Sequence, residues 1–194
     1  CCIRGICVSR FTVSALPLSG LYKITRQVLG DNRGYLSRLF CNDELRRVGW
    51  TKPIAQINHT FTQKQGAVRG MHFQNPPHEE MKLICCIRGE VWDVAVDLRK
   101  HSPTFLDWHA ERLSADNHCA VVIPEGFAHG FQALSEDCEL LYLHSSPYSA
   151  ESESGLNILD PLLKIEWPLN ISEISERDKT HPMTSPSYEG MTFL

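Results

Sequence analysis

Residues 66–98 of the chain read GAVRGMHFQNPPHEEMKLICCIRGEVWDVAVDL. The apolar run at 83–98 is interrupted by an Arg-Gly pair, and such a break predicts two strands separated by a turn. Just before this run, residues 69–74 hold an arginine, a histidine and an amide side chain. The stretch therefore predicts a buried pair of strands that lies beside a compact group of polar side chains.

The composition indicates one globular domain with neither a nucleic-acid nor a membrane partner. A chain of 194 residues and 22.0 kDa is long enough to bury a sizeable core. Its net charge is -4, without a basic stripe, and no apolar window is long enough to span a bilayer. The eight cysteines form no C-x-x-C pair, so we interpret them as free thiols of a cytoplasmic protein.

Turn-forming residues recur along the chain, and short β-branched or apolar runs lie between them. This rhythm is typical of an all-β sandwich or barrel. We expect an edge strand at 19–27, where apolar and polar residues alternate. A second alternating strand is expected at 53–62, which places Gln56, Asn58 and Thr60 on one face.

Helical patterns are confined to short segments at 42–48 and 172–179. Residues 1–18 lack a cleavage pattern and are expected to be a loose leader. Residues 19–180 are expected to form the single domain. Residues 181–194 carry Pro, Ser and Gly and are expected to be a loose tail.

Two histidines and one lysine are candidates for chemistry. His72 could act as a general base, although an isolated histidine is more often structural. Lys82 follows ten residues later, and glycines that permit a close approach to a ligand flank the turn around His129. Asp93 and Asp97 alternate on one strand, which suggests a glycosidase pair. We favour the interpretation that these carboxylates either are polar positions on one face of the strand or orient a neighbouring histidine.

A metal site is the weaker interpretation of the same region. Its possible ligands are His72, His78, Glu79, Glu80 and His129. Metal-binding double-stranded β-helix proteins often carry an H-x-H motif, whereas this chain has the triplet H-F-Q. The second ligand is therefore missing, and the His-Glu-Glu run after two prolines indicates an exposed loop.

Many short segments follow one another in the order of a known family. They are GDNRG at 30–34, RGMHFQ at 69–74, KL at 82–83, GEVWDVAVDLR at 89–99, SPTF at 102–105, LSADN at 113–117, IPEGFAHGF at 123–131, LY at 141–142, DP at 160–161, IEWP at 165–168 and SERD at 175–178. In these segments the chain resembles the dTDP-4-dehydrorhamnose 3,5-epimerase family. The resemblance implies a cupin-type, double-stranded β-helix (jelly-roll) barrel with a few short peripheral helices.

The resemblance also implies the reaction: epimerisation of a nucleoside-diphosphate 4-keto-6-deoxy sugar through an enolate. His72 corresponds to the base and Asp178 to the carboxylate that orients it. Lys82 corresponds to the cation that stabilises the enolate oxygen, and Tyr142 to the acid on the other face. No metal or organic cofactor is implied, and the chain is expected to be a homodimer that contacts its partner through N-terminal strands.

A further set of positions is expected to bind the nucleotide sugar. It comprises Arg33, Arg38, Gln56, Asn58, Arg69, His129 and Tyr148. Guanidinium groups suit a diphosphate because they offer paired N–H donors. The product would supply deoxysugars such as rhamnose for polysaccharides or glycosylated metabolites.

Three positions depart from the family pattern and leave the exact reaction open. Leu29 replaces a common aromatic residue, Arg38 replaces a common glutamate, and Pro147-Tyr148 replaces a pair of tyrosines. A 3-epimerase, a ketoisomerase or an enzyme for another nucleotide sugar therefore remains an alternative. A non-catalytic sugar-nucleotide-binding cupin and a metal-dependent cupin oxygenase are the alternatives from other classes.

Overall fold

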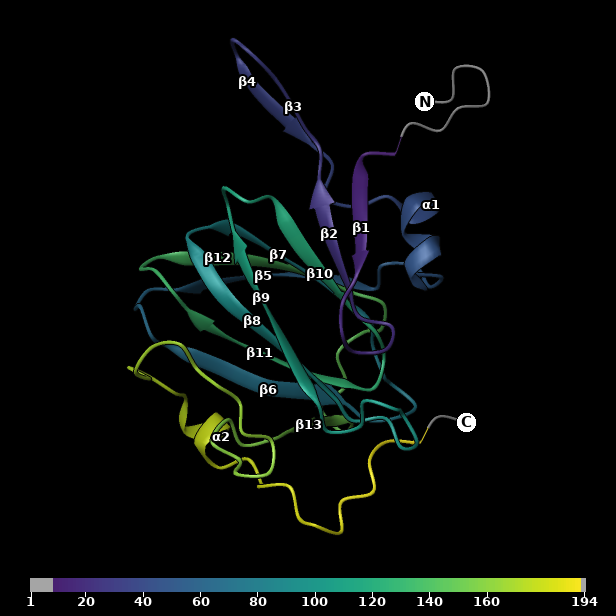
Figure 1. The fold of residues 1–194 in the computed structure, drawn as a ribbon, viewed down its shortest axis with the longest axis vertical. Helices are drawn as coiled ribbons and strands as arrows, with labels where there is room; N and C mark the ends of the chain where they lie inside the picture. The colour runs from purple at the N-terminus through teal and green to yellow at the C-terminus, as the bar shows by residue number, and fades with distance from the viewer. Residues whose placement is uncertain (1–8, 193–194) are drawn as a thin grey trace.

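The computed structural model describes residues 9–192, which fold into two antiparallel sheets and a separate hairpin. The six-stranded sheet has the order β1-β2-β10-β7-β12-β5 and the five-stranded sheet the order β13-β6-β11-β8-β9. The strands are β1 (Phe11–Ala15), β2 (Tyr22–Arg26), β3 (Val28–Asp31), β4 (Gly34–Ser37), β5 (Gln56–Thr62), β6 (Val68–Gln74), β7 (Lys82–Arg88), β8 (Glu90–Asp97), β9 (Trp108–Ser114), β10 (Cys119–Ile123), β11 (Phe127–Ala133), β12 (Cys138–His144) and β13 (Glu153–Gly155). Figure 1 shows the β3–β4 hairpin projecting away from the barrel.

The central apolar run forms β7 and β8, as the sequence predicts, and the chain turns at Gly89. Gly89 has a φ of 74°, which L-residues with a side chain rarely adopt. A Cβ there would also lie 2.6 Å from the hydroxyl of Ser135. β7 and β8 then enter different sheets, so this turn connects the two walls of the barrel.

The core lies between the sheets and is filled by side chains from both. Ile84 and Leu140 contribute from the six-stranded sheet, and Val91, Phe127 and Phe131 contribute from the five-stranded sheet. Each is at most 4% exposed, so their apolar surface is almost fully removed from water. The all-β prediction is confirmed. The strands that pack around this core also carry the polar side chains described below.

Two segments expected to be loose are packed in the structure. Residues 11–15 of the expected leader form β1, which pairs along its whole length with β2. The strand expected at 19–27 is therefore β2 in the interior of the sheet, and the prediction of an edge position is wrong. In the tail, Met191 bridges to Arg99 and Thr184 donates hydrogen bonds to Asp160. These parts of the expected leader and tail are therefore packed against the rest of the chain, while residues 1–8 lie outside the described residues.

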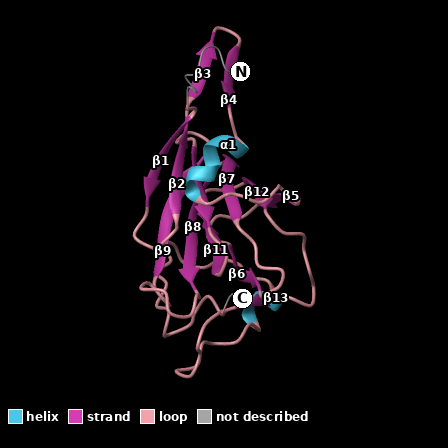
Figure 2. Ribbon diagram, turned by 90° about the vertical axis from the view of Figure 1, so that its right-hand side faces the viewer, coloured by secondary structure: helices cyan, strands magenta, loops and turns pink. Residues whose placement is uncertain are grey.

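The two short helices lie outside the strands (Figure 2). α1 (Asn42–Leu45) continues into a 3-10 turn (Arg46–Val48) and stops at Gly49, which has the expected left-handed φ of 86°. Its N-cap is Cys41. α2 (Glu176–Lys179) has Ser175 as its N-cap and is shorter than the helical segment expected at 172–179. No helix among the described residues is long and apolar enough to cross a membrane.

Candidate active site

A cavity of about 990 Å³ is lined by both sheets and by the segment that leads into α2. β5, β7 and β12 line it from the six-stranded sheet, and β6 and β11 line it from the five-stranded sheet. The four expected catalytic residues, His72, Lys82, Tyr142 and Asp178, all lie on its wall. Five of the seven expected binding residues also line it: Gln56, Asn58, Arg69, His129 and Tyr148.

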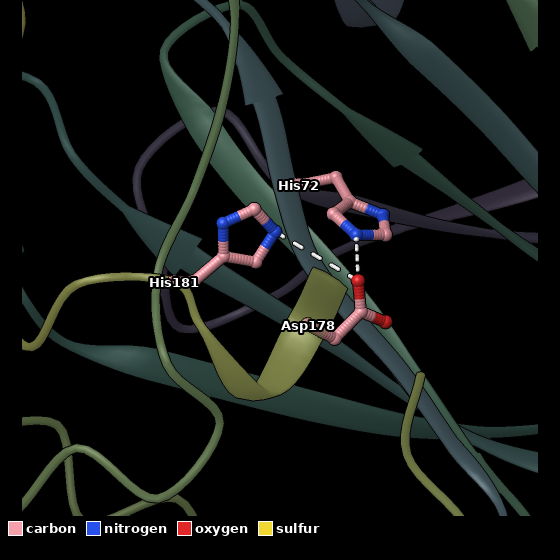
Figure 3. A group of neighbouring side chains, drawn as sticks. All are labelled: His72, Asp178 and His181. Carbon is pink, nitrogen blue, oxygen red and sulfur yellow. Dashed lines mark hydrogen bonds and ion pairs between the residues drawn. The ribbon is translucent and has the colours of Figure 1, made fainter. Parts of the chain in front are cut away.

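Asp178 holds the ring of His72 in place (Figure 3). The Oδ1 atom of Asp178 lies 2.8 Å from Nε2 of His72, and its Oδ2 atom accepts a hydrogen bond from the backbone N–H of Gly70 at 3.2 Å. The Ser175 hydroxyl accepts from the backbone N–H of Asp178 at 3.1 Å and so fixes the start of α2. The cap of α2 thus positions Asp178, and β6, which is distant in sequence, positions His72.

The environment of Asp178 keeps its carboxyl ionised. Burial acts to raise its pKa, but the hydrogen bond and charge of His72, together with the hydrogen bonds of Gly70 and Ser175, lower it to about 2. An ionised carboxylate accepts the Nε2 proton of a neutral imidazole. No described residue hydrogen bonds to Nδ1 of His72, so Nδ1 is the nitrogen that can take up a proton.

The lowered pKa of Asp178 predicts a pH-dependent contribution to stability. The pKa falls from an ordinary 3.8 to about 2 on folding, which corresponds to about 2 kcal/mol. This contribution is present above pH 4 and is lost as the pH falls through the folded pKa. We expect the difference in free energy of unfolding between wild type and Asp178→Asn to shrink by about 2 kcal/mol from pH 5 to pH 2.

Urea unfolding at a series of pH values measures this difference. Asp116→Asn is the matched control, because Asp116 is exposed and has no described hydrogen bond through its side chain. A difference for Asp178→Asn that stays constant down to pH 2 would contradict the ion-pair interpretation.

Tyr142 enters the cavity from the six-stranded sheet, whereas His72 enters from the five-stranded sheet. The ring of Tyr142 contacts His129 edge-on at 5.7 Å between centroids and stacks with His144 at 6.2 Å. Burial, followed by the negative charge of Asp93, raises the pKa of Tyr142. The phenol therefore stays protonated at neutral pH, as a proton donor must.

Lys82 is part of a buried network at the start of β7. Its ammonium group donates to the backbone oxygen of His72 and lies near Glu80, both at 3.2 Å. Glu80 also binds Nδ1 of His144 at 2.8 Å, and Nε2 of His144 lies 3.4 Å from the amide of Asn58. This network holds a cation directly beside the strand that carries His72, where it can stabilise developing negative charge.

His129 forms a second histidine–carboxylate pair with Asp93, at 2.8 Å between Nε2 and Oδ2. Both side chains are almost fully buried. The favoured interpretation of Asp93, as an orienter of a neighbouring histidine, agrees with this contact. Asp97 instead binds Arg99, Ser102 and other groups away from the cavity, so the glycosidase pair is not formed.

The other expected binding residues are held by neighbours along the rim. Arg69 donates to the Thr62 hydroxyl and to the backbone oxygen of Phe61, both at 3.0 Å. Gln56 accepts from the backbone N–H of Tyr148 at 2.8 Å. Asn58 and Thr60 share the cavity face of β5 with Gln56, as the alternation in sequence predicts. The positioned amide and guanidinium groups are suited to a polar, anionic ligand.

Arg33 and Arg38 lie away from this cavity. Arg33 is at the tip of the β3–β4 hairpin, where it pairs with Asp31 at 2.6 Å. Arg38 follows β4 and pairs with Glu44 of α1 at 2.6 Å. In the described part of the chain, residues 9–192, neither arginine lines the cavity. A single copy of the chain therefore does not bring them to His72.

Some charged or titratable residues on the cavity wall are not named as site residues by the sequence analysis, among them Glu80, His144, Glu153 and Arg177. His144 is two positions after Tyr142, so strand alternation would have placed it on the same face. The sequence places Glu80 in an exposed loop and suggests it only as a metal ligand. In the structure its side chain is 8% exposed. Arg177, whose NH2 group lies 3.1 Å from Nε2 of His72, gave no signal in the sequence.

The chain was compared with known proteins. The sequence model of a family described as dTDP-4-dehydrorhamnose 3,5-epimerase matches residues 15–185. The chain belongs to this family. It is 38% identical over 169 residues to the dTDP-4-dehydrorhamnose 3,5-epimerase of Sinorhizobium fredii, with 87% of each chain covered. Both the predicted family and the predicted barrel are thereby confirmed.

Two further similar proteins differ in the number of carbons that their names say are epimerised. The crystal structure of the Bacillus anthracis epimerase with TDP and pyrophosphate bound has a TM-score of 0.86 at 35% identity, covering 90% of this chain and 99% of the other. The dTDP-4-dehydrorhamnose 3-epimerase of Streptomyces niveus is 38% identical, covering 84% and 79%. Similar chains therefore carry names for epimerisation at one carbon or at two.

Proposed function

We propose that this member of the family epimerises a nucleoside-diphosphate 4-keto-6-deoxy sugar, of the type dTDP-4-dehydro-6-deoxy-D-glucose to dTDP-4-dehydro-L-rhamnose. One observation carries the proposal: His72 and Tyr142 enter one cavity from opposite sheets. Inversion at carbon requires that a proton leaves one face and arrives at the other. A base and an acid on opposite walls supply these two steps without moving the substrate.

The chemistry starts from the C4 ketone, which makes the protons at C3 and C5 weakly acidic. Nδ1 of His72 takes the proton from one carbon, and the C–H electron pair becomes the enolate, with its charge on the C4 oxygen. Tyr142 donates its phenolic proton to the opposite face of that carbon and the ketone re-forms. His72 then releases its extra proton to solvent, and the phenolate of Tyr142 takes up a proton from solvent.

Asp178 and Lys82 make these transfers easier. The ionised Asp178 stabilises the imidazolium ion that forms on His72 and keeps the ring in one orientation. Lys82 places a positive charge near the enolate oxygen, and an electrostatic donor of this kind typically contributes about 10²–10³ in rate. The reaction uses only side chains of this chain, so the proposal includes no cofactor.

Hydrogen exchange in D₂O tests the proposal and counts the epimerised carbons. The protein is incubated with dTDP-4-dehydro-6-deoxy-D-glucose, and NMR follows deuterium at C3 and C5. We expect deuterium at both carbons together with inverted configuration. Deuterium at C3 alone would identify a 3-epimerase, and a shifted carbonyl would identify a ketoisomerase. No exchange with this sugar, or with its CDP- and GDP-linked forms, would favour a non-catalytic binding protein.

We also propose that the chain acts as a homodimer. The projecting β3–β4 hairpin exposes Leu29, Tyr35 and Leu36, of which the last two are each 66% exposed. A second copy covering this hairpin would remove that apolar surface from water and would bring Arg33 toward the partner's cavity. Sedimentation equilibrium tests this, since twice the chain mass is expected and the chain mass alone would contradict it.

We place the reaction in the cytoplasm, in deoxysugar supply for polysaccharides or glycosylated metabolites. The described cysteines, at 41, 85, 86, 119 and 138, are all free thiols, which fits a reducing compartment. Cell fractionation tests the location, and recovery of the protein from an oxidising compartment would contradict it.

A further inference from the structure

His181 shares the carboxylate of Asp178 with His72. Its Nε2 atom lies 3.7 Å from Oδ1 of Asp178, and Nε2 of His72 lies 2.8 Å from the same oxygen. Figure 3 shows both imidazoles directing a nitrogen at this one oxygen, with His181 arriving from the segment after α2. The two rings meet edge-on at 5.6 Å between centroids. The reaction proposed above assigns no role to His181.

The surroundings hold His181 in this position without giving its Nε2 atom a hydrogen bond. The ring lies against the backbone of Gly155, where a Cβ would come within 2.4 Å of Nε2. Gly155 pairs in β13 with His72 of β6, so the same strand pairing supports both histidines. Nε2 of His181 is buried and makes no hydrogen bond. A buried, unpaired polar atom is costly, which indicates that it has a ligand in some state of the protein.

Two imidazoles and one carboxylate are a common ligand set for divalent transition metals. The three ligand atoms all lie within 4.8 Å of one another, while ligands around a tetrahedral ion are about 3.3 Å apart. Small side-chain rotations therefore suffice to close the site.

We propose that His72, Asp178 and His181 form a binding site for a divalent transition metal ion, which inhibits the enzyme. The ion is coordinated by the two Nε2 atoms and by Oδ1 of Asp178, and the ring proton of His72 moves from Nε2 to Nδ1, so the imidazole stays neutral. A metal-bound imidazole no longer serves as a base. The binding site stands on its geometry alone, and only the inhibition rests on the proposed epimerase function.

Arg177 opposes the ion. Its guanidinium group lies 3.1 Å from Nε2 of His72 and 3.6 Å from Oδ1 of Asp178. The side chain is 56% exposed and is also bound to Glu153, so it can turn outward when a cation arrives. Removing its positive charge should strengthen metal binding, because like charges repel across a few ångströms.

Cobalt(II) chloride is the probe, since its visible spectrum reports the ligand type. The full chain is titrated and binding is followed by absorption and calorimetry. We expect one ion per chain with imidazole and carboxylate ligation, and no thiolate charge-transfer band from the cysteines. His181→Ala should weaken binding at least about tenfold, equal to 1.4 kcal/mol. Arg177→Ala should strengthen it, a gain that misfolding cannot produce.

His59→Ala is the matched control, because His59 is an exposed histidine outside the cavity, and its cobalt affinity should equal that of wild type. Equal cobalt affinity in wild type and His181→Ala, or a spectrum with thiolate bands alone, would overturn the site. If cobalt shows imidazole ligation but the protein exchanges hydrogen with no sugar, the metal-site proposal stands and the proposed epimerase function is contradicted. Cobalt that binds at the site without slowing hydrogen exchange would overturn the inhibition.

Discussion

His72→Ala is expected to lower the rate of epimerisation by about 10³-fold or more, with little change in the fold. Nδ1 of His72 is the proton acceptor in the proposed reaction, and a positioned general base typically contributes about 10²–10⁴ in rate. The side chain is 26% exposed on the cavity wall, so its removal leaves no sealed hole in the core. Turnover of dTDP-4-dehydro-6-deoxy-D-glucose measures the effect, and circular dichroism checks the fold.

Added imidazole separates a chemical role of His72 from a structural one. The alanine variant leaves space for a small base beside Asp178, so free imidazole should restore part of the activity. His59→Ala again serves as the control and should turn over normally, because His59 is paired with Glu139 outside the cavity. Near-wild-type turnover by His72→Ala would show that another group removes the proton.

Tyr142→Phe is expected to separate hydrogen exchange from inversion. The variant keeps the ring that contacts His129 and His144 and loses only the phenolic hydroxyl group. His72 can still form the enolate and return a solvent-derived proton to the original face. Deuterium should therefore enter C3 with retention of configuration, while the inverted product forms about 10²–10⁴-fold more slowly. NMR in D₂O reads both quantities in one sample.

The ratio of the hydrogen-exchange rate to the inversion rate decides whether Tyr142 is the acid that protonates the opposite face. If both rates fall by the same factor, Tyr142 acts before enolate formation and is not the acid of the opposite face. Tyr188→Phe provides the control, since Tyr188 stacks on Phe105 outside the cavity and its phenol has no place in the reaction. That variant should keep the wild-type ratio.

Local signals in the sequence were enough to predict much of the strand pattern. The break at Gly89 follows from one residue that turns freely, and the common face of Gln56, Asn58 and Thr60 follows from the two-residue period of a strand. Family motifs added the barrel and the four catalytic candidates. The predictions of the strands and of the barrel succeed because each depends on neighbours in the chain or on a motif that persists as a unit.

Other features depend on contacts between distant segments, and local patterns do not encode them. β2 alternates like an edge strand, yet β1 covers it because five backbone pairs form along it. The tail has a loose composition, yet it packs through Met191 and Thr184. Composition reports the average preference of a segment, whereas packing depends on the surface that the rest of the fold presents to it.

The sequence by itself determined the all-β class, the family and the residue types available for proton transfer. The family resemblance already implied that Asp178 orients His72, 106 positions away, but only the tertiary structure decided that His181 joins them over Gly155. It also decided that Tyr142 faces them from the other sheet and that Glu80 joins Lys82 to His144. The physical reason is that strand register and sheet pairing set the distances between residues remote in sequence, and these arise from the packing of the whole barrel.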